Sequence, residues 1–155
     1  MNPIPAATAS TFTTQFHGYL GGLLRWDEFD ALCQTIIHQE ADASDLTRWY
    51  IYAIGEAVPQ QPANLTELTR FMQNINELLH REHQESYCGI VYTDSRSTPT
   101  FVKIYDPHHL GSACGSGSHP PPLPGWTLSH ALPIKLEPVM PITGSRKRWW
   151  NALFP

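Results

Sequence analysis

The sequence predicts an α+β fold in which about three amphipathic helices pack on one face of a small antiparallel sheet. Its 155 residues suit one domain, and 41% hydrophobic with 15% charged residues excludes a disordered chain. Apolar residues recur with a helical period of about 3.6 in the first half and with a strand period of about 2 after Ser86. No apolar run approaches the roughly 20 residues that a membrane-spanning helix needs.

Three stretches show the helical period, over residues 26–39, 44–58 and 64–82. Pro59 follows the second stretch and ends it, while Asn64 and Glu67 have the spacing of a capping box at the start of the third. The three apolar stripes consist of Phe29, Leu32, Cys33, Ile36 and Ile37; of Leu46, Trp49, Tyr50, Ala53, Ile54 and Ala57; and of Leu68, Phe71, Met72, Ile75, Leu78 and Leu79. Each helix would bury one face, so a common apolar surface is required.

The second half supplies that surface as strands. Residues 88–93 and 100–105 are rich in β-branched and aromatic residues, and the polar segment 94–99 between them predicts an antiparallel hairpin. Alternation places Val102 and Ile104 on one face, with Phe101, Lys103 and Tyr105 on the other. Residues 126–129 form a third candidate strand, with Trp126 expected in the core, and residues 134–136 form a weaker fourth one.

The chain divides into a domain and two tails. Residues 1–14 carry no charged side chain and predict a flexible N-terminal tail without the basic start of a secretory signal. Residues 15–145 form the single α+β domain, and residues 146–155 a basic aromatic C-terminal tail. Residues 1–98 hold 12 acidic and 5 basic side chains, whereas residues 99–155 hold 2 acidic and 5 basic ones.

A long Gly/Ser/Pro-rich loop between the second and third predicted strands contains the candidate metal ligands and the candidate nucleophile of this sequence. His108, Cys114 and His119 offer donors that would suit zinc, the one cofactor the sequence suggests, although their spacing matches no standard motif. Cys114 lies among glycines that could aim backbone N–H groups at an oxyanion, and His109 is a candidate base for a cysteine nucleophile. The alternative is an ordinary surface loop, because Gly, Ser and Pro are common loop residues.

Two segments are candidates for binding a partner. Pro122 and Pro124 belong to a run that suits a polyproline II segment. Basic residues stand directly beside tryptophans in the C-terminal tail, a composition that suits an anionic partner; the residues concerned are Arg146, Arg148, Trp149 and Trp150. Alternatively, the tail aromatics fold back and seal the core. A net charge of −4 argues against nucleic acid as a partner, except through this tail.

The leading hypothesis is a small accessory or regulatory protein that binds another protein and needs no cofactor. Three cysteines cannot all pair within one chain, so a reducing cytoplasm is expected. The alternative is a small cysteine-dependent enzyme or a metal-binding protein that uses the loop 106–119. The sequence makes no prediction of the oligomeric state.

Overall fold

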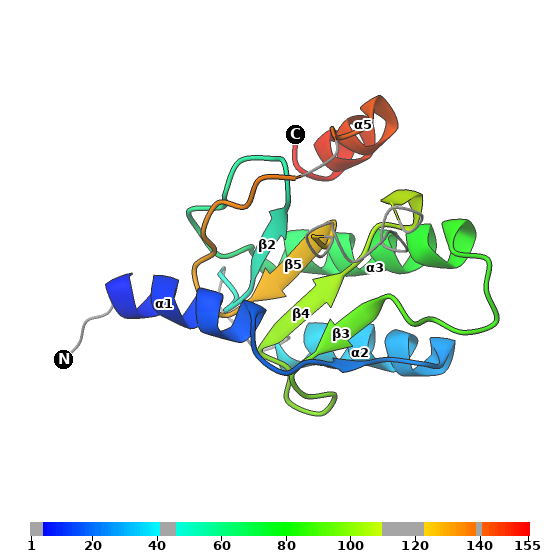
Figure 1. The fold of residues 1–155 in the computed structure, drawn as a ribbon, viewed down its shortest axis with the longest axis horizontal. Helices are drawn as coiled ribbons and strands as arrows, with labels where there is room; N and C mark the ends of the chain where they lie inside the picture. The colour runs from blue at the N-terminus through cyan, green and yellow to red at the C-terminus, as the bar shows by residue number, and fades with distance from the viewer. Residues whose placement is uncertain (1–4, 41–45, 110–122, 139–140) are drawn as a thin grey trace, which may run out of the picture.

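The computed structural model describes residues 5–40, 46–109, 123–138 and 141–155, with the side chains from residue 11 onward except that of His109, and has the predicted α+β architecture (Figure 1). The elements in chain order are α1 (Pro5–Phe16), β1 (Gly21–Gly22), α2 (Trp26–Gln39), β2 (Tyr50–Ala53), α3 (Leu65–Glu82), β3 (Val91–Thr93), β4 (Phe101–Ile104), the 3-10 turn η1 (Pro107–His109), β5 (Trp126–Ser129) and α5 (Gly144–Leu153).

The five strands form one antiparallel sheet in the order β1-β3-β4-β5-β2. The predicted hairpin is confirmed as β3 and β4, in which Val91 pairs with Ile104 and Thr93 with Val102. Asp94 closes its turn, because its Oδ1 atom accepts hydrogen bonds from the backbone N–H groups of Thr100 and Phe101 at 2.9 and 3.0 Å. The third predicted strand is confirmed as β5, which lies between β4 and β2.

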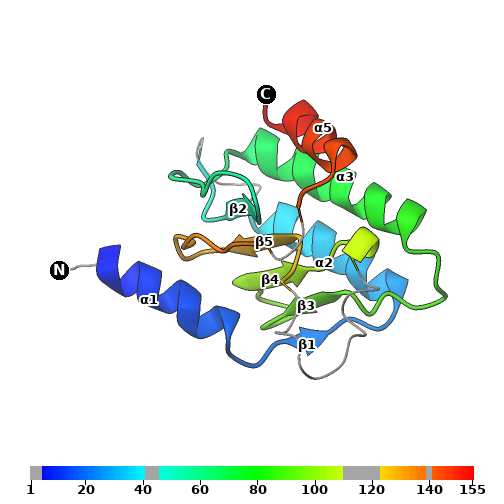
Figure 2. The ribbon, with the colours of Figure 1, turned by 45° about the horizontal axis from the view of Figure 1, so that its top comes forward.

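Helices cover both faces of the sheet. α2 and α3 pack on the face that carries Val102 and Ile104, and they form the main core with it. α1 lies on the opposite face, where Phe12 and Phe16 pack against Phe101 (Figure 2). The predicted alternation is therefore confirmed within β4, from Phe101 to Ile104, whereas Tyr105 follows the strand and packs against the main core. The sequence predicted helices on one face only, and α1 is the reason for the difference.

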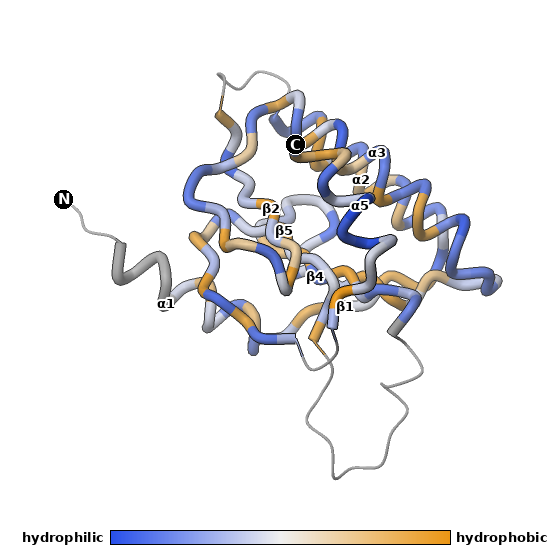
Figure 3. Tube along the Cα trace, turned by 90° about the horizontal axis from the view of Figure 1, so that it is seen from above, coloured by the Kyte–Doolittle hydropathy of each residue, from blue (hydrophilic) through white to orange (hydrophobic). Residues whose placement is uncertain are grey.

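Two of the three predicted helices are confirmed. α2 spans residues 26–39 as predicted, and α3 follows the capping box, in which Asn64 Oδ1 accepts from Glu67 N at 2.7 Å. Glu67 Oε1 in turn accepts from Asn64 N at 2.9 Å. Both helices alternate apolar and polar positions along their length (Figure 3), as expected for helices that bury one face.

The predicted helix over residues 44–58 is wrong. Residues 44 and 45 lie outside the described part of the chain; residues 50–53 are the strand β2, and the structure has no helix within residues 46–58. Trp49, Ile51 and Ala53 alternate with two tyrosines, so the segment fits a strand as well as a helix. Pairing with β5 over four residues decides between the two, since that ladder buries Trp49, Ile51 and Ala53 in the core.

The N-terminal segment is also more ordered than predicted. Residues 1–4 lie outside the described part, but residues 5–16 form α1 rather than a flexible tail. Phe12 and Phe16 are one helical turn apart, and both rings are buried. This contact stabilises a helix that has no charged residue and little amphipathic pattern of its own.

The C-terminal tail is a helix as well. α5 begins at Gly144, after the N-cap Thr143, and buries Leu153 against the main core. Residues 134–136, the weaker fourth strand of the prediction, form no strand. Instead, the backbone N–H of Leu136 donates to the hydroxyl of Tyr52 at 2.9 Å.

Candidate functional site

The base of the Gly/Ser/Pro-rich loop is the first candidate site. The chain leaves β4 through Asp106 and enters η1, where the backbone N–H of His108 donates to Asp106 Oδ1 at 2.9 Å. His109 contributes its backbone to η1. Cys114, His119 and Pro122 lie outside the described residues. The metal and nucleophile hypotheses therefore stay predictions, and only the base of the loop has a geometry to examine.

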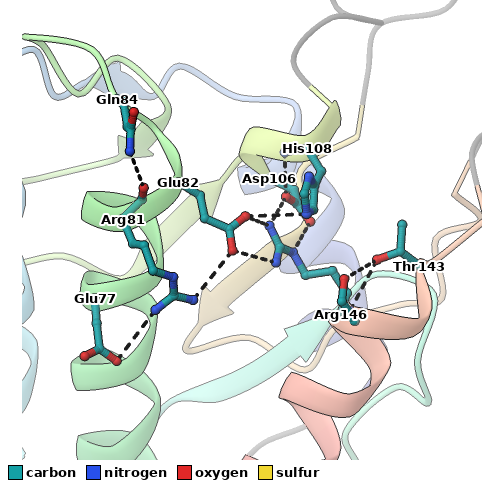
Figure 4. A network of polar contacts seen from close by, with 9 residues as sticks. Glu77, Arg81, Glu82, Gln84, Asp106, His108, Thr143 and Arg146 are labelled. Atoms are coloured by element: carbon teal, nitrogen blue, oxygen red, sulfur yellow. Dashed lines mark hydrogen bonds and ion pairs between the residues drawn. The ribbon is translucent and has the colours of Figure 1, made fainter.

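Arg146 of α5 occupies this base. Its Nε and Nη2 atoms donate to the two oxygens of Asp106, each at 2.9 Å, while Nη2 and Nη1 donate to Glu82 at 2.7 and 3.3 Å (Figure 4). Two carboxylates thus surround one guanidinium, and the side chains of Arg146 and Asp106 are each only 7% exposed. The side chain ties together three elements: the end of α3, the end of β4 and the first turn of α5.

The contacts within this cluster shift the pKa values of Arg146 and Glu82. Burial alone would lower the pKa of Arg146, but hydrogen bonds and charge from Asp106 and Glu82 outweigh it, so the pKa is raised. The hydrogen bond from Arg146 lowers the pKa of Glu82. Because its donors are taken up by two carboxylates, Arg146 has little capacity left for an anionic partner.

His108, the described member of the proposed metal set, faces this cluster. Its Nε2 atom lies 3.5 Å from Glu82 Oε1, with about half of the side chain exposed. Asp106 and Glu82 are close by, but the guanidinium lies between them where a cation would otherwise sit. No group of three metal-ligating side chains occurs among the residues that the structure describes.

The C-terminal aromatics pack on the domain itself. The ring of Trp149 lies 5.5 Å from Trp126 and 6.3 Å from Phe71, centre to centre, and the Trp150 ring lies 6.4 Å from Phe71. Both tryptophans are half-buried against the main core. Of the alternatives for this segment, the packing follows the one in which the aromatics seal the core.

The other residues proposed for partner binding are divided between core and surface. Pro124 is buried beside β5, while Arg148 is exposed on α5. Exposed cations of α5 are thus limited to Arg148 and its neighbour Lys147. Lys147 lines an open hollow of about 600 Å³ that Glu56, Lys135 and Glu137 also line. Because both acidic and basic side chains line this hollow, it favours neither an anionic nor a cationic ligand.

The two cysteines with described surroundings are poor nucleophiles. Cys33 lies on the buried face of α2, as expected, and burial raises the pKa of its thiol to about 12. Burial also raises the pKa of Cys88. Cys88 belongs to no metal set with the nearby histidines, because His83 Nε2 bonds the Cys88 carbonyl oxygen at 2.8 Å and His80 Nε2 bonds Asp30 at 2.9 Å.

The sequence analysis missed the edge of the sheet at β1. Three large hydrophobic side chains are exposed around it: Tyr19 at 91%, Leu24 at 67% and Tyr87 at 53%. Tyr19 and Leu24 flank the two glycines of β1, and Tyr87 precedes Cys88, whose N–H donates to the Leu24 carbonyl at 2.8 Å. We call these three residues the edge patch. Single apolar residues near glycines carry no periodic signal, so only the fold reveals that the segments holding these residues are neighbours.

Comparisons with known proteins identify no relative of this chain. No protein-family model matches this chain, and no curated protein or solved structure shows significant similarity to it. Within the described residues, no helix is long and apolar enough to cross a membrane. Functional inference therefore depends on the geometry of the described surface.

Proposed function

We propose that this chain is a small cytoplasmic accessory or regulatory protein that acts by binding another protein, without catalysis. The contact we assign is the β1 edge, where an extended segment of the partner adds as a further strand. The observation that carries this proposal is the exposure of Tyr19 and Leu24 before and after the terminal strand β1, with Tyr87 exposed on the neighbouring segment that leads into β3.

The backbone of β1 supports strand addition. The N–H of Leu23 donates to Val91 O at 2.9 Å, and its carbonyl accepts from Gly89 N at 2.8 Å. Neighbouring residues of a strand direct their backbone groups to opposite sides, so the N–H and C=O of Gly22 point away from β3. β1 is terminal in the strand order, and among the described residues no strand pairs with its outer side. Pairing of a partner strand with such free backbone groups is a common mode of peptide recognition.

The side chains support it as well. Gly21 and Gly22 present no side chains of their own to an added strand, and Tyr19 and Leu24 lie two residues before and two residues after them. Burying one large apolar side chain stabilises a complex by about 1.5–3 kcal/mol. The edge patch therefore offers enough apolar surface to offset part of the entropy that association costs.

The region first proposed for the partner is less suitable. Arg146 is enclosed by Asp106 and Glu82, and the two tryptophans of α5 pack on the core. Binding through them would require α5 to leave the domain and would separate the Arg146 guanidinium from the buried Asp106 carboxylate. The β1 edge requires no such rearrangement.

The test is a binding comparison on purified proteins. A partner retained by the wild-type protein is identified, purified and titrated by calorimetry against wild type, Tyr19→Asp and Leu24→Asp. Because each aspartate puts a charge into an apolar contact, we expect at least about tenfold weaker binding, or about 1.4 kcal/mol. Amide hydrogen exchange over residues 20–23 should slow on binding.

Ile134→Asp is the matched control, since Ile134 is also exposed but lies outside the edge patch. Its affinity should equal that of wild type. Equal affinity of all variants would contradict the assigned edge. If wild type instead sediments as a dimer and Leu24→Asp as a monomer, the edge pairs with a second copy and the partner proposal fails.

A further inference from the structure

Lys103 occupies an unusual position at the centre of the sheet. It lies on β4, the middle strand, and its side chain projects toward the face covered by α1. Its Nζ atom lies 3.9 Å from the centre of the Phe16 ring. In the strand register its direct neighbours are Tyr92 on β3 and Thr127 on β5, so all three side chains share this face.

The Lys103 amine has no carboxylate to balance it. No hydrogen bond or ion pair joins it to any residue in the described ranges, and α1, which packs over it, contains no acidic residue. The titratable side chains around it are Tyr92, its neighbour in register, Tyr105, whose ring lies 5.8 Å from that of Tyr92, and His17, whose ring lies 5.2 Å from that of Phe16. Burial lowers the pKa of Lys103, and no charged group opposes that effect.

Thr127 provides a second, independent observation. It is fully buried, and its hydroxyl oxygen has no hydrogen-bond partner within the described part of the chain. Buried hydroxyl groups are nearly always paired, so an unpaired one requires a reason. Thr127 is the direct neighbour of Lys103 in the strand register, so its unpaired hydroxyl lies on the same face of the sheet as the Lys103 side chain.

We propose that Lys103 is a nucleophilic amine that binds a small aldehyde or ketone covalently, as an imine, on the α1 side of the sheet. The neutral amine attacks the carbonyl carbon, and the electron pair of the C=O bond moves to oxygen. That oxygen takes up a proton while the nitrogen loses one, which gives a carbinolamine. Loss of one water molecule then leaves the C=N bond. The Thr127 hydroxyl is the group that donates a hydrogen bond to the reacting oxygen.

The surroundings indicate the class of ligand. Phe16 and Tyr92 place aromatic rings on this face of the sheet, so a carbonyl compound with an apolar or aromatic body fits better than a charged one. Lys103 is only half-buried, so the residue is not sealed from solvent.

The chain contains only three lysines, which provides internal controls. Lys135 pairs with Glu137 at 3.2 Å with its side chain 72% exposed, and Lys147 is exposed on α5. The full-length protein is treated with benzaldehyde and cyanoborohydride between pH 6 and pH 10, and adducts are quantified by peptide mass spectrometry. At pH 7 we expect Lys103 to react severalfold faster than the other two lysines, with a pH midpoint below theirs. A rate equal to or below that of Lys135 would overturn the proposal.

Two variants separate chemistry from folding. Lys103→Arg should lose only the adduct at residue 103, with the rates at Lys135 and Lys147 unchanged. Thr127→Val keeps the shape of the side chain and removes a hydroxyl that has no partner, so the fold should persist. It should slow labelling of Lys103 without moving its pH midpoint. An unchanged rate in Thr127→Val would show that the hydroxyl has no part in the reaction and would overturn its assigned role.

Discussion

Asp106 and Arg146 form two parallel hydrogen bonds of 2.9 Å each, although they are 40 residues apart in the sequence. Asp106 stands where the chain leaves β4 for the Gly/Ser/Pro-rich loop, and Arg146 stands in the first turn of α5. The pair therefore fixes the C-terminal helix to the base of that loop. Such bidentate pairs are geometrically specific, which suits a contact that positions one element against another.

Arg146→Met tests this contact. It removes the charge that balances the buried Asp106 carboxylate, so we expect a loss of about 3–5 kcal/mol in the free energy of unfolding by urea. Arg148→Met, on the same helix but exposed, should stay within about 0.5 kcal/mol of wild type. Equal losses in the two variants would contradict a specific role for Arg146.

The pH dependence of stability should depend on Glu82. Its pKa is lower in the folded protein than the ordinary value of 4.5, because Arg146 stabilises the carboxylate. The unfolded chain therefore takes up this proton first as the pH falls, so the contribution is present above the unfolded pKa and is lost through the folded one. Between about pH 5 and about pH 3, wild type should lose more free energy of unfolding than Glu82→Gln. The exposed Glu85→Gln should follow wild type, and parallel curves for all three proteins would refute the coupling.

Trp149→Ala distinguishes a sealing helix from a docking segment. Because its ring packs against Trp126 and Phe71, truncation should reduce the free energy of unfolding by about 3 kcal/mol. Asn151→Ala, at an exposed position of α5, is the control and should change little. An unaltered urea midpoint in Trp149→Ala would contradict the sealing role and would favour partner binding by α5.

Phe12→Ala tests whether the N-terminal helix belongs to the domain. The ring is fully buried against Phe16 and Phe101, so its removal should cost about 3 kcal/mol. Thr14→Ala, exposed on the same helix, should cost far less. A flexible tail would show equal stability for both variants, measured by thermal and urea unfolding.

Alkylation of the three cysteines tests the enzyme alternative. Cys33 and Cys88 are buried with raised pKa values, so iodoacetamide should label neither in the native protein at pH 8. If Cys114 is a nucleophile, its labelling rate should reach half-maximum well below the ordinary thiol pKa of about 8.5. A midpoint near 8.5 would count against the cysteine-dependent enzyme.

Sequence patterns predicted the elements that carry their own signal. α2 and α3 each repeat apolar residues on one face, and the capping box of Asn64 and Glu67 marks where α3 begins. The hairpin of β3 and β4 was predictable because its strands alternate and its turn is polar. The candidate site was less predictable: the edge patch has no motif, and the Lys103 environment depends on which helix covers the sheet.

What the sequence determined by itself was therefore local: the α+β class, two helices with their boundaries, a hairpin and the strand at Trp126. Tertiary structure decided the rest. β2 is a strand because its four residues pair with β5. α1 is a helix because Phe12 packs against Phe101. In the same way, Arg146 is part of the fold because Asp106 and Glu82 meet it from two other elements. The physical reason is that a short segment has two conformations of similar free energy, and burial against distant residues selects between them.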